Sequence, residues 1–179
     1  LFTESAYIEQ EVLKETVGFQ DQALAAHGGL NHVTFHQNGK LSVRPLTLSS
    51  ERIRELSAHL MLFYTGIVRT ASDVARSYVD DILARERQLM RMGELVKEGL
   101  SVLEGDGDMS DFGRLLHEGW CVKCSLSGSV TNSSLDEIYS RAQEAGALGG
   151  KVVGAGGGGF MLLFVPPERQ RDVSKRLGE

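Results

Sequence analysis

A run of glycines ahead of an apolar segment constrains this chain more than any other feature. The stretch "GGKVVGAGGGGFMLLFV", from Gly149 to Val165, places seven of the chain's 21 glycines in its first eleven residues and continues with six apolar residues. Successive glycines lose much conformational entropy on folding, so such a run is expected where side chains would collide with something close. The sequence therefore predicts a tight glycine-rich turn followed by a strand.

Two familiar glycine loops are excluded by their context. Gly154, Gly156 and Gly159 satisfy G-x-G-x-x-G, but a dinucleotide-binding loop must open a helix, and "FMLLFV" predicts a strand. A Walker A loop is excluded because Lys151 is followed by valine where Ser or Thr would bind Mg²⁺. Two interpretations remain: backbone N–H groups that bind a ligand phosphate, or close packing of a neighbouring element over the turn.

Composition narrows the class of protein. With 179 residues, of which 41% are apolar, the chain is long enough for one packed domain or slightly more. The net charge of -5 predicts no general affinity for nucleic acid or anionic lipid. No apolar run is long enough to span a membrane and the first residues do not resemble a signal peptide, so we expect a cytoplasmic protein. The oligomeric state stays open.

Hydrophobic periodicity predicts a loose alternation of helices and strands, which indicates the α+β class. Composition changes after Pro45, so we place a domain boundary there, between residues 1–46 and 47–179. The expected helices cover 3–14, Asp21 to the Gly28-Gly29 pair, Thr70 to Met92 (cap Thr70 or Ser72), a Trp120 helix (cap Ser110 or Asp111), 135–145 (cap Ser133 or Ser134) and the segment after Pro167. The expected strands form a hairpin with Asn38-Gly39 as a two-residue turn, then "HLMLFYTG" ending at Gly66, Lys151 to Val153 and "FMLLFV".

Cys121 and Cys124 form a C-x-x-C pair, which suggests a redox pair or half of a zinc site. No second pair of ligands follows at metal spacing, and Cys124 continues an i, i+4 series with Trp120 that is typical of a buried helix stripe. We therefore expect reduced, structural thiols.

Two segments together resemble a known family. "GGKVVGAGGGGFMLLFV" resembles the third signature of the GHMP kinases, and "IEQEVLKETVGFQDQALAAHGGLN" resembles the segment in which their sugar-specific members carry Gly-x-x-Asp-Gln. The nearest subgroup is the D-glycero-D-manno-heptose 7-phosphate kinases, because "LFYTGIVRTAS" and "LLHEGWCVKCSLS" are also similar to its sequences.

The resemblance implies a fold. Residues 47–179 would form the GHMP C-terminal domain, a ferredoxin-like α+β sandwich, and residues 1–46 the end of the N-terminal domain, which is ribosomal S5 domain 2-like. The family's Pro-x-x-x-Gly-Leu-Gly-Ser-Ser loop, which wraps the ATP phosphates, is not present, nor is the Lys or Arg beside the catalytic Asp. We therefore expect a C-terminal portion of a longer enzyme that is inactive by itself.

The resemblance also implies roles for particular residues. Asp21 matches the catalytic aspartate that accepts or orients the proton of the attacking hydroxyl. Glu9 matches the glutamate that binds Mg²⁺, with Glu11 as a competitor. The loop from Gly154 to Gly158, in particular Gly154, Gly156, Gly157 and Gly158, would lie near the ATP phosphates. The residues alone also allow purely structural roles: Asp21 could cap a helix, and either glutamate could lie on a solvated helix face.

Other residues are candidates for the sugar substrate. "RTAS" opens the long expected helix, where Arg69, Thr70 and Ser72 would bind a phosphate that the substrate already carries. Gly28 and Gly29 are further candidates. An ordinary surface arginine beside a helix cap explains "RTAS" equally well. His117 and Lys123 would face a cleft or solvent, and Trp120 the core.

The function that follows is transfer of the γ-phosphate of ATP, with Mg²⁺, to the anomeric hydroxyl of a heptose 7-phosphate, which would feed the synthesis of a nucleotide sugar (GDP-heptose). One alternative is a kinase of an unphosphorylated sugar such as galactose or fucose. Another is a non-catalytic sugar-binding module.

Overall fold

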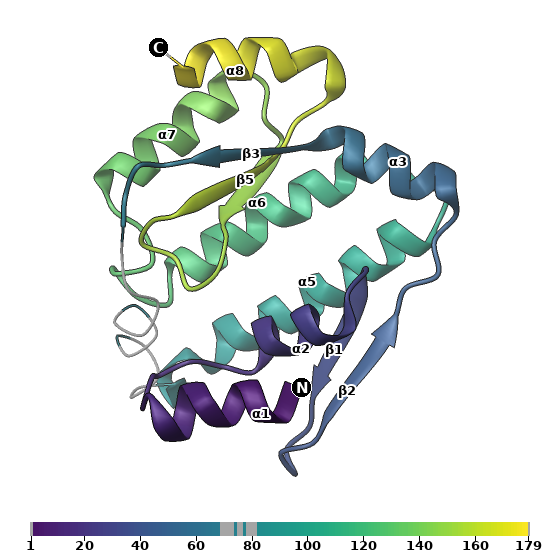
Figure 1. Ribbon diagram of the computed structural model, residues 1–179. Coiled ribbons are helices and arrows are strands. Elements are labelled where there is room, and N and C mark those ends of the chain that lie inside the picture. The colour runs from purple at the N-terminus through teal and green to yellow at the C-terminus, as the bar shows by residue number, and fades with distance from the viewer. Residues whose placement is uncertain (1, 69–73, 75–76, 78–81, 179) are drawn as a thin grey trace. The chain divides into compact units, whose positions relative to one another are not determined.

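The structure, a computed structural model, describes residues 2–68, 74, 77 and 82–178 (Figure 1). The chain divides into two compact units, Leu1–Leu48 and Ser49–Glu179. Both contain helices together with a small antiparallel sheet, which confirms the expected α+β class. The assignment of residues 1–46 and 47–179 to two kinase domains stays a prediction.

The first unit begins with a helix that changes its winding. Its elements are α1 (Phe2–Tyr7), the π-helical turn η1 (Ile8–Val12), α2 (Gln20–His27), β1 (Asn31–Phe35) and β2 (Leu41–Pro45). The helix expected over 3–14 is thus present from Phe2 to Val12, but its second half is π-wound, and the amide of Leu13 bonds the carbonyl of Ile8, five residues back, at 2.8 Å. α2 ends as predicted, with positive φ of +65° at Gly28 and +71° at Gly29.

The β1–β2 hairpin closes with a different turn from the one expected. The last residue pair of the ladder is Phe35 with Leu41, and the amide of Gly39 bonds the carbonyl of His36 at 2.9 Å. A two-residue type I′ turn needs positive φ at both central residues, but in this turn only Gly39 has it, at +77°. The two-residue Asn38-Gly39 turn is therefore wrong: a longer loop ends with Gly39 in the left-handed conformation.

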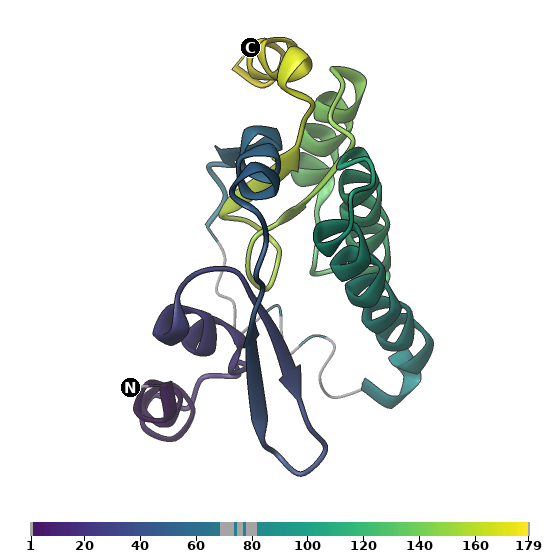
Figure 2. The same ribbon diagram turned by 90° about the vertical axis from the view of Figure 1, so that its right-hand side faces the viewer.

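The second unit is built around a three-stranded antiparallel sheet in the order β3-β5-β4 (Figures 1 and 2). β5 is the central strand, and the glycine-rich segment joins it directly to β4. The bounds are α3 (Ser50–His59), β3 (Leu60–Tyr64), the 3₁₀ turn η2 (Ile82–Arg85), α5 (Glu86–Glu104), α6 (Ser110–Cys124), α7 (Ser133–Glu144), β4 (Gly149–Val152), β5 (Phe160–Phe164), the 3₁₀ turn η3 (Pro167–Arg169) and α8 (Gln170–Gly178).

Helices α5 and α6 run side by side in both views (Figures 1 and 2). A Cβ atom at Gly99 would lie 3.4 Å from the ring of Phe112, so a small residue lets the two helices approach closely. The expected helix end at Met92 is wrong, because α5 continues to Glu104 and buries Leu95 and Leu103 on its inner side. The expected start at Thr70 lies outside the described residues.

The caps of two helices differ from those expected. The side chain of Asn132 accepts a hydrogen bond from the amide of Leu135 at 3.1 Å, so Asn132 caps α7 in place of Ser133 or Ser134. At the start of α6 the Asp108 carboxylate accepts from the amide of Ser110 at 2.9 Å, and this bond lowers the pKa of Asp108. In both cases an earlier polar side chain binds the free amides of the first turn.

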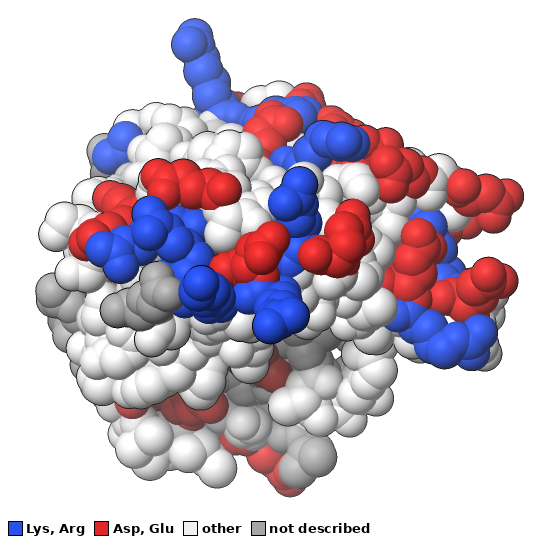
Figure 3. Space-filling view, turned by 90° about the horizontal axis from the view of Figure 1, so that it is seen from above, with Lys and Arg blue, Asp and Glu red and all other residues white. Residues whose placement is uncertain are grey.

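The surface over α7 and α8 carries charges of both signs. Figure 3 shows acidic and basic side chains intermingled on the face seen from above. A hollow of about 430 Å³ is lined by Glu144, Ala145, Asp172, Lys175 and Arg176, and Arg176 pairs with Glu144 at 3.1 Å. Such exposed pairs stabilise little and create no field of one sign. Among the described residues, no helix is both long and apolar enough to cross a membrane.

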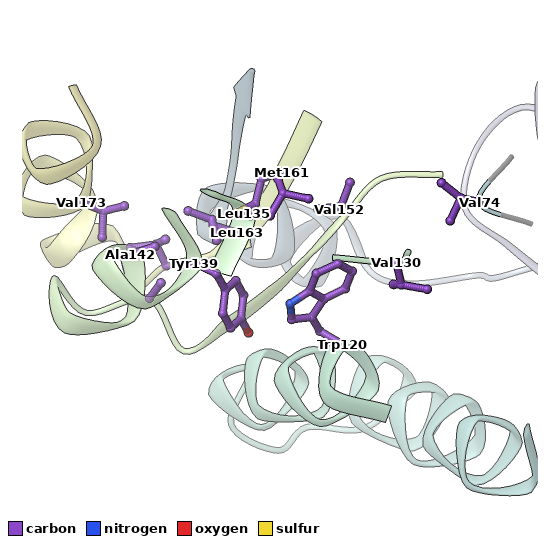
Figure 4. Close-up of a cluster of buried hydrophobic side chains, with 12 residues drawn as sticks. Val74, Trp120, Val130, Leu135, Tyr139, Ala142, Val152, Met161, Leu163 and Val173 are labelled. Atoms are coloured by element: carbon purple, nitrogen blue, oxygen red, sulfur yellow. The ribbon is translucent and has the colours of Figure 1, made fainter. Parts of the chain in front are cut away.

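The core of the second unit lies between the sheet and helices α6 and α7 (Figure 4). Trp120 of α6 is 4% exposed, as expected of a core residue, and its ring lies 6.2 Å from that of Tyr139 of α7. Cys121 and Cys124 are both free thiols, and Cys124 packs against this cluster. The remaining buried members are Val74, Val130, Leu135, Ala142, Ala147, Val152, Met161, Leu163, Val165 and Val173.

Candidate functional site

The glycine loop, residues 153–159 between β4 and β5, has a backbone that only glycine adopts easily. φ is +79° at Gly154, +116° at Gly156, +76° at Gly157 and +85° at Gly159. Residues with a Cβ atom rarely occupy this region, because Cβ crowds the neighbouring carbonyl oxygen. The glycines are therefore required by the conformation of the loop.

Two other segments of the second unit, residues 65–67 and 130–132, hold the loop in place. The amide of Gly157 bonds the carbonyl of Val130, and the amide of Gly159 bonds that of Ile67, both at 2.8 Å. The Thr65 hydroxyl donates to the Gly159 carbonyl at 2.8 Å, and the Asn132 side-chain amide donates to the Gly157 carbonyl at 3.2 Å. These bonds fix the backbone of the loop before any ligand arrives.

Close packing and ligand binding are both compatible with this loop. A Cβ atom would lie 2.7 Å from the Val130 carbonyl oxygen at Gly156 and 2.5 Å from that of Ile67 at Gly158. At the same time, the amides of Gly154, Gly156 and Gly158 have no acceptor in the part of the chain that the structure describes. Gly157 differs, because its amide is already bonded within the protein. Backbone amides of this kind can donate to an anion.

A lysine contacts the glycine loop from the end of α6. The Lys123 ammonium donates to the carbonyl oxygen of Gly154 at 2.6 Å. His117, which precedes Lys123 on α6, is half-buried, with Nδ1 2.9 Å from the hydroxyl of Tyr139. Burial raises the pKa of Tyr139, so this hydroxyl stays protonated. Of the two residues expected to face a cleft or solvent, Lys123 contacts the loop and His117 packs against α7.

Asp21 lies in the first turn of α2 without capping it. The N-cap residue of α2 is Phe19, and no side chain bonds the free amides there. Asp21 is exposed, and its carboxylate has no hydrogen bond or ion pair to any described residue. The helix-cap explanation of Asp21 therefore finds no support in the geometry.

The two candidate metal ligands have different surroundings. Glu9 is half-buried in the π-turn, and its Oε2 accepts a hydrogen bond from Nε2 of Gln22, the residue after Asp21. Glu11 points to solvent and pairs with Lys14 at 3.0 Å, with 60% of its side chain exposed. Only Glu9 is thus held next to the segment that carries Asp21.

The remaining candidates fall into two groups. Gly28 and Gly29 end α2, and the Asn31 side-chain amide donates to the Gly28 carbonyl at 2.7 Å, which explains both glycines by the helix end alone. Arg69, Thr70 and Ser72 lie outside the described residues.

Comparison with known proteins decides the family. Residues 94–179, from within α5 to the end of the chain, match the family profile described as "GHMP kinases C terminal". The chain contains a GHMP kinase C-terminal domain. The glycine loop lies inside the matched range, which confirms the resemblance seen in the sequence.

Three relatives of this chain are informative. A Campylobacter jejuni protein named D-glycero-alpha-D-manno-heptose 7-phosphate kinase is 34% identical over 95% of this chain and 50% of its own length. A bifunctional fucokinase/GDP-fucose pyrophosphorylase of Arabidopsis thaliana is 31% identical over 90% of this chain and 16% of its own length. The crystal structure of a D-glycero-D-manno-heptose 1-phosphate kinase from Bacteroides thetaiotaomicron matches 99% of this chain and 47% of its own, with a TM-score of 0.68 and 26% identity. The chain thus spans half or less of each.

The donor set of this chain suits Mg²⁺ better than a softer metal. Within the described ranges, no cluster of three or more His, Cys, Asp or Glu side chains is placed to hold a metal ion. Mg²⁺ needs no such cluster, because it commonly takes one or two carboxylates together with substrate phosphates and water. Glu9 supplies one carboxylate, and Oε1 of the neighbouring Gln22 is a buried oxygen with no partner among the described residues. These residues fit the ion.

The structure brings to these segments three residues for which the sequence predicts no such contact. Gln22 bonds Glu9, Lys123 bonds the glycine loop, and Asn132 both caps α7 and bonds the loop. A signal existed for Gln22, because it completes the Gly-x-x-Asp-Gln pattern. The contacts of Lys123 and Asn132 with the loop join residues far apart in the sequence.

Proposed function

We propose that this chain is part of an ATP-dependent sugar kinase that phosphorylates the anomeric hydroxyl of a heptose 7-phosphate and supplies nucleotide-sugar (GDP-heptose) synthesis. The observation that carries the proposal is the exposed carboxylate of Asp21, which caps no helix and directly precedes the residue bonded to Glu9. The Campylobacter relative's name supports the choice of substrate.

In the proposed reaction the anomeric oxygen of the sugar attacks the γ-phosphorus of ATP. A bond forms between that oxygen and phosphorus, the bond to the β-phosphate oxygen breaks, and ADP leaves. Asp21 orients the hydroxyl and takes its proton as the new bond forms, because a carboxylate becomes the better acceptor once charge moves toward phosphorus. The products are a sugar 1-phosphate and ADP.

We assign the phosphates of ATP to the glycine loop and the Mg²⁺ ion to Glu9. The free amides of Gly154, Gly156 and Gly158 donate to phosphate oxygens, on which negative charge accumulates during transfer. Glu9 holds the bound Mg²⁺, which offsets phosphate charge when present. Gly157 contributes by keeping the loop in shape.

The second phosphate of the substrate needs a separate site. Arg69, together with Thr70 and Ser72, is our candidate for the 7-phosphate, because a guanidinium binds a phosphate through two parallel hydrogen bonds. Gly28 and Gly29 at the end of α2 are candidates for contacts with the sugar. Replacing Arg69 by Ala should raise KM sharply for a phosphorylated sugar only.

A kinase of an unphosphorylated sugar is the second candidate function. The Arabidopsis relative is a fucokinase by name and matches most of this chain. A sugar-binding module without catalysis is a third candidate. The exposed carboxylate of Asp21 speaks against it, since sugar binding alone requires no proton acceptor.

ADP release by the full-length gene product separates the candidates. The protein would be supplied with ATP and Mg²⁺ and, one at a time, with heptose 7-phosphate, free heptose, galactose and fucose. Turnover confined to heptose 7-phosphate is the expected result. Preference for a free sugar would retain the kinase and change its substrate, and no turnover with any sugar would favour the binding module.

The role of Asp21 is tested by Asp21→Asn, which keeps the shape and removes the proton acceptor. Loss of general base catalysis lowers kcat by about 10²–10⁴-fold. Asp106→Asn is a matched control, because Asp106 is exposed on the loop between α5 and α6. Activity of Asp21→Asn within about tenfold of the parent would show that Asp21 is not the catalytic group.

A further inference from the structure

Gln22 is buried in a way that packing alone does not explain. It is 8% exposed, and it is the one polar side chain classed as buried in the described part of the chain. Its Nε2 donates to Glu9, whereas its buried Oε1 has no partner among the described residues. A buried amide with an unpaired oxygen opposes folding, so the stability of the unit does not account for its presence.

The partner of Gln22 lies on a distorted turn. Glu9 is the second residue of the π-helical turn Ile8–Val12, whose wide winding is a feature often found at functional sites. The carboxylate uses Oε2 to accept the Gln22 amide, and Oε1 has no partner among the described residues. One oxygen of Glu9 is therefore fixed by α2, and the other remains available to a ligand.

The position of Gln22 in α2 links it mechanically to Asp21. Consecutive side chains on an α-helix project about 100° apart. When Gln22 points inward to Glu9, the rotation of the first turn of α2 is fixed, and Asp21 is directed outward. The Gln22 amide thus sets the orientation of the Glu9 carboxylate by direct contact and that of the Asp21 carboxylate through the helix.

We infer that Gln22 is a positioning residue that holds Glu9 and, through the first turn of α2, Asp21 in the arrangement needed for metal-assisted phosphoryl transfer. The inference rests on the proposed function, in which these two carboxylates act. It goes further by giving a specific task to Gln22, to which the proposed function assigns none.

The chain offers a matched control in Gln10. This glutamine follows Glu9 directly, and its Nε2 donates to the carbonyl of Val17 at 2.7 Å. It therefore ties the same turn to the segment that leads into α2, through a backbone carbonyl and not through a carboxylate. Gln10→Met and Gln22→Met remove the same amide from neighbouring places, and only Gln22→Met releases Glu9.

The test uses the full-length gene product in the parent form and as Gln22→Met, Gln10→Met, Glu9→Gln and the Glu9→Gln/Gln22→Met double variant. Binding of Mn²⁺ in the presence of ADP is measured by electron paramagnetic resonance, without sugar, and kcat and KM are measured separately. We expect Gln22→Met to weaken Mn²⁺ binding and lower kcat by about tenfold or more, as is usual when a ligand loses its supporting hydrogen bond, with KM for the sugar nearly unchanged. Gln10→Met should alter the melting temperature alone.

The double variant shows whether Gln22 acts through Glu9. If it does, adding Gln22→Met to Glu9→Gln changes Mn²⁺ binding by less than about twofold, because the carboxylate that Gln22 positions is already absent. The inference would be overturned if the two substitutions weakened Mn²⁺ binding independently, so that their separate effects multiplied in the double variant. It would also be overturned by a Gln22→Met variant that loses stability but binds Mn²⁺ like the parent. If Gln22→Met fails to fold, Gln22→Asn withdraws the donor by one methylene and should give the same loss.

The same experiment separates this inference from the proposed function. If Glu9→Gln weakens Mn²⁺ binding but Gln22→Met does not, the inference fails and the proposed metal site stands. If Glu9→Gln has no effect on Mn²⁺ binding, the proposed role of Glu9 fails, and the inference fails with it.

Discussion

The ammonium nitrogen of Lys123 lies 2.6 Å from the carbonyl oxygen of Gly154 and donates a hydrogen bond to it. This contact joins the last turn of α6 to the first left-handed residue of the glycine loop. It brings a positive charge to the edge of a group of unbonded backbone amides. A cation in that position both holds the loop and favours an anion bound to it.

We therefore expect Lys123→Met to weaken nucleotide binding. The loop loses one of its attachments and the site loses a charge, so KM for ATP should rise by about fivefold to tenfold, the equivalent of one charged hydrogen bond at a half-exposed position. Lys97→Met on α5 is the control, because Lys97 is exposed and does not contact the loop. Equal KM values for the two variants in steady-state kinetics would contradict the role of Lys123.

Single glycine-to-alanine substitutions in the loop should destabilise the protein to different degrees, according to the space around each glycine. Gly156→Ala combines a positive φ with a Cβ atom 2.7 Å from the Val130 carbonyl, whereas at Gly154 the φ is positive but no atom lies within 4 Å. We expect Gly156→Ala to lower the free energy of unfolding by about 3 kcal/mol or more and Gly154→Ala by about 1–2 kcal/mol. Urea unfolding at equilibrium measures both, and the reverse order would show that the loop relaxes around the new side chain.

Two glycines inside α6 form a second matched pair. A Cβ atom at Gly113 would lie 2.5 Å from the ring of Phe164, whereas at Gly119 its nearest neighbour, in Leu95, is 3.9 Å away. Gly113→Ala should destabilise the protein by about 1–3 kcal/mol through overpacking. Gly119→Ala should stabilise it by up to about 1 kcal/mol, because alanine favours the helix. Thermal unfolding of both variants gives the comparison, and equal shifts would mean that α6 does not press on β5 at Gly113.

The two thiols should differ in their reaction with iodoacetamide. Burial raises the pKa of Cys124 to about 11, whereas Cys121 is exposed. With this pKa, about one Cys124 side chain in a thousand is ionised to the thiolate at pH 8. The rate of alkylation at Cys124 should therefore increase about tenfold with each pH unit until the pKa is reached. The single variants Cys121→Ser and Cys124→Ser, followed by mass spectrometry, isolate each thiol. Fast labelling of Cys124 at pH 8 would show that its surroundings open in solution.

Features encoded by neighbouring residues could be predicted from the sequence. The apolar run that forms β3, its end at Gly66 and the Gly28-Gly29 end of α2 all follow from local side-chain properties. The caps were missed because several adjacent polar residues can bond the same amides, and Asn132 and Asp108 prevailed over the serines that follow them. The π-turn carries no sequence mark that separates it from a continuing α-helix.

The candidate site could be predicted only in part. Asp21 and Glu9 were singled out through the family pattern, and their roles stay predictions. The contacts that shape the glycine loop could not be foreseen, because Lys123 is 31 residues from Gly154 and Asn132 is 25 from Gly157. Which residues meet across such distances is decided by how α6 and α7 pack on the sheet.

The two hairpin connections of this chain should respond very differently to inserted peptides. The β1–β2 tip at residues 36–40 is exposed throughout, and its hydrogen bonds stay within the hairpin. The β4–β5 connection is bonded to Ile67, to the segment from Val130 to Asn132 and to Lys123, so lengthening it would break attachments to three separate segments. An epitope tag or fluorescent reporter belongs at the first connection, whereas the second has a length that the rest of the fold dictates.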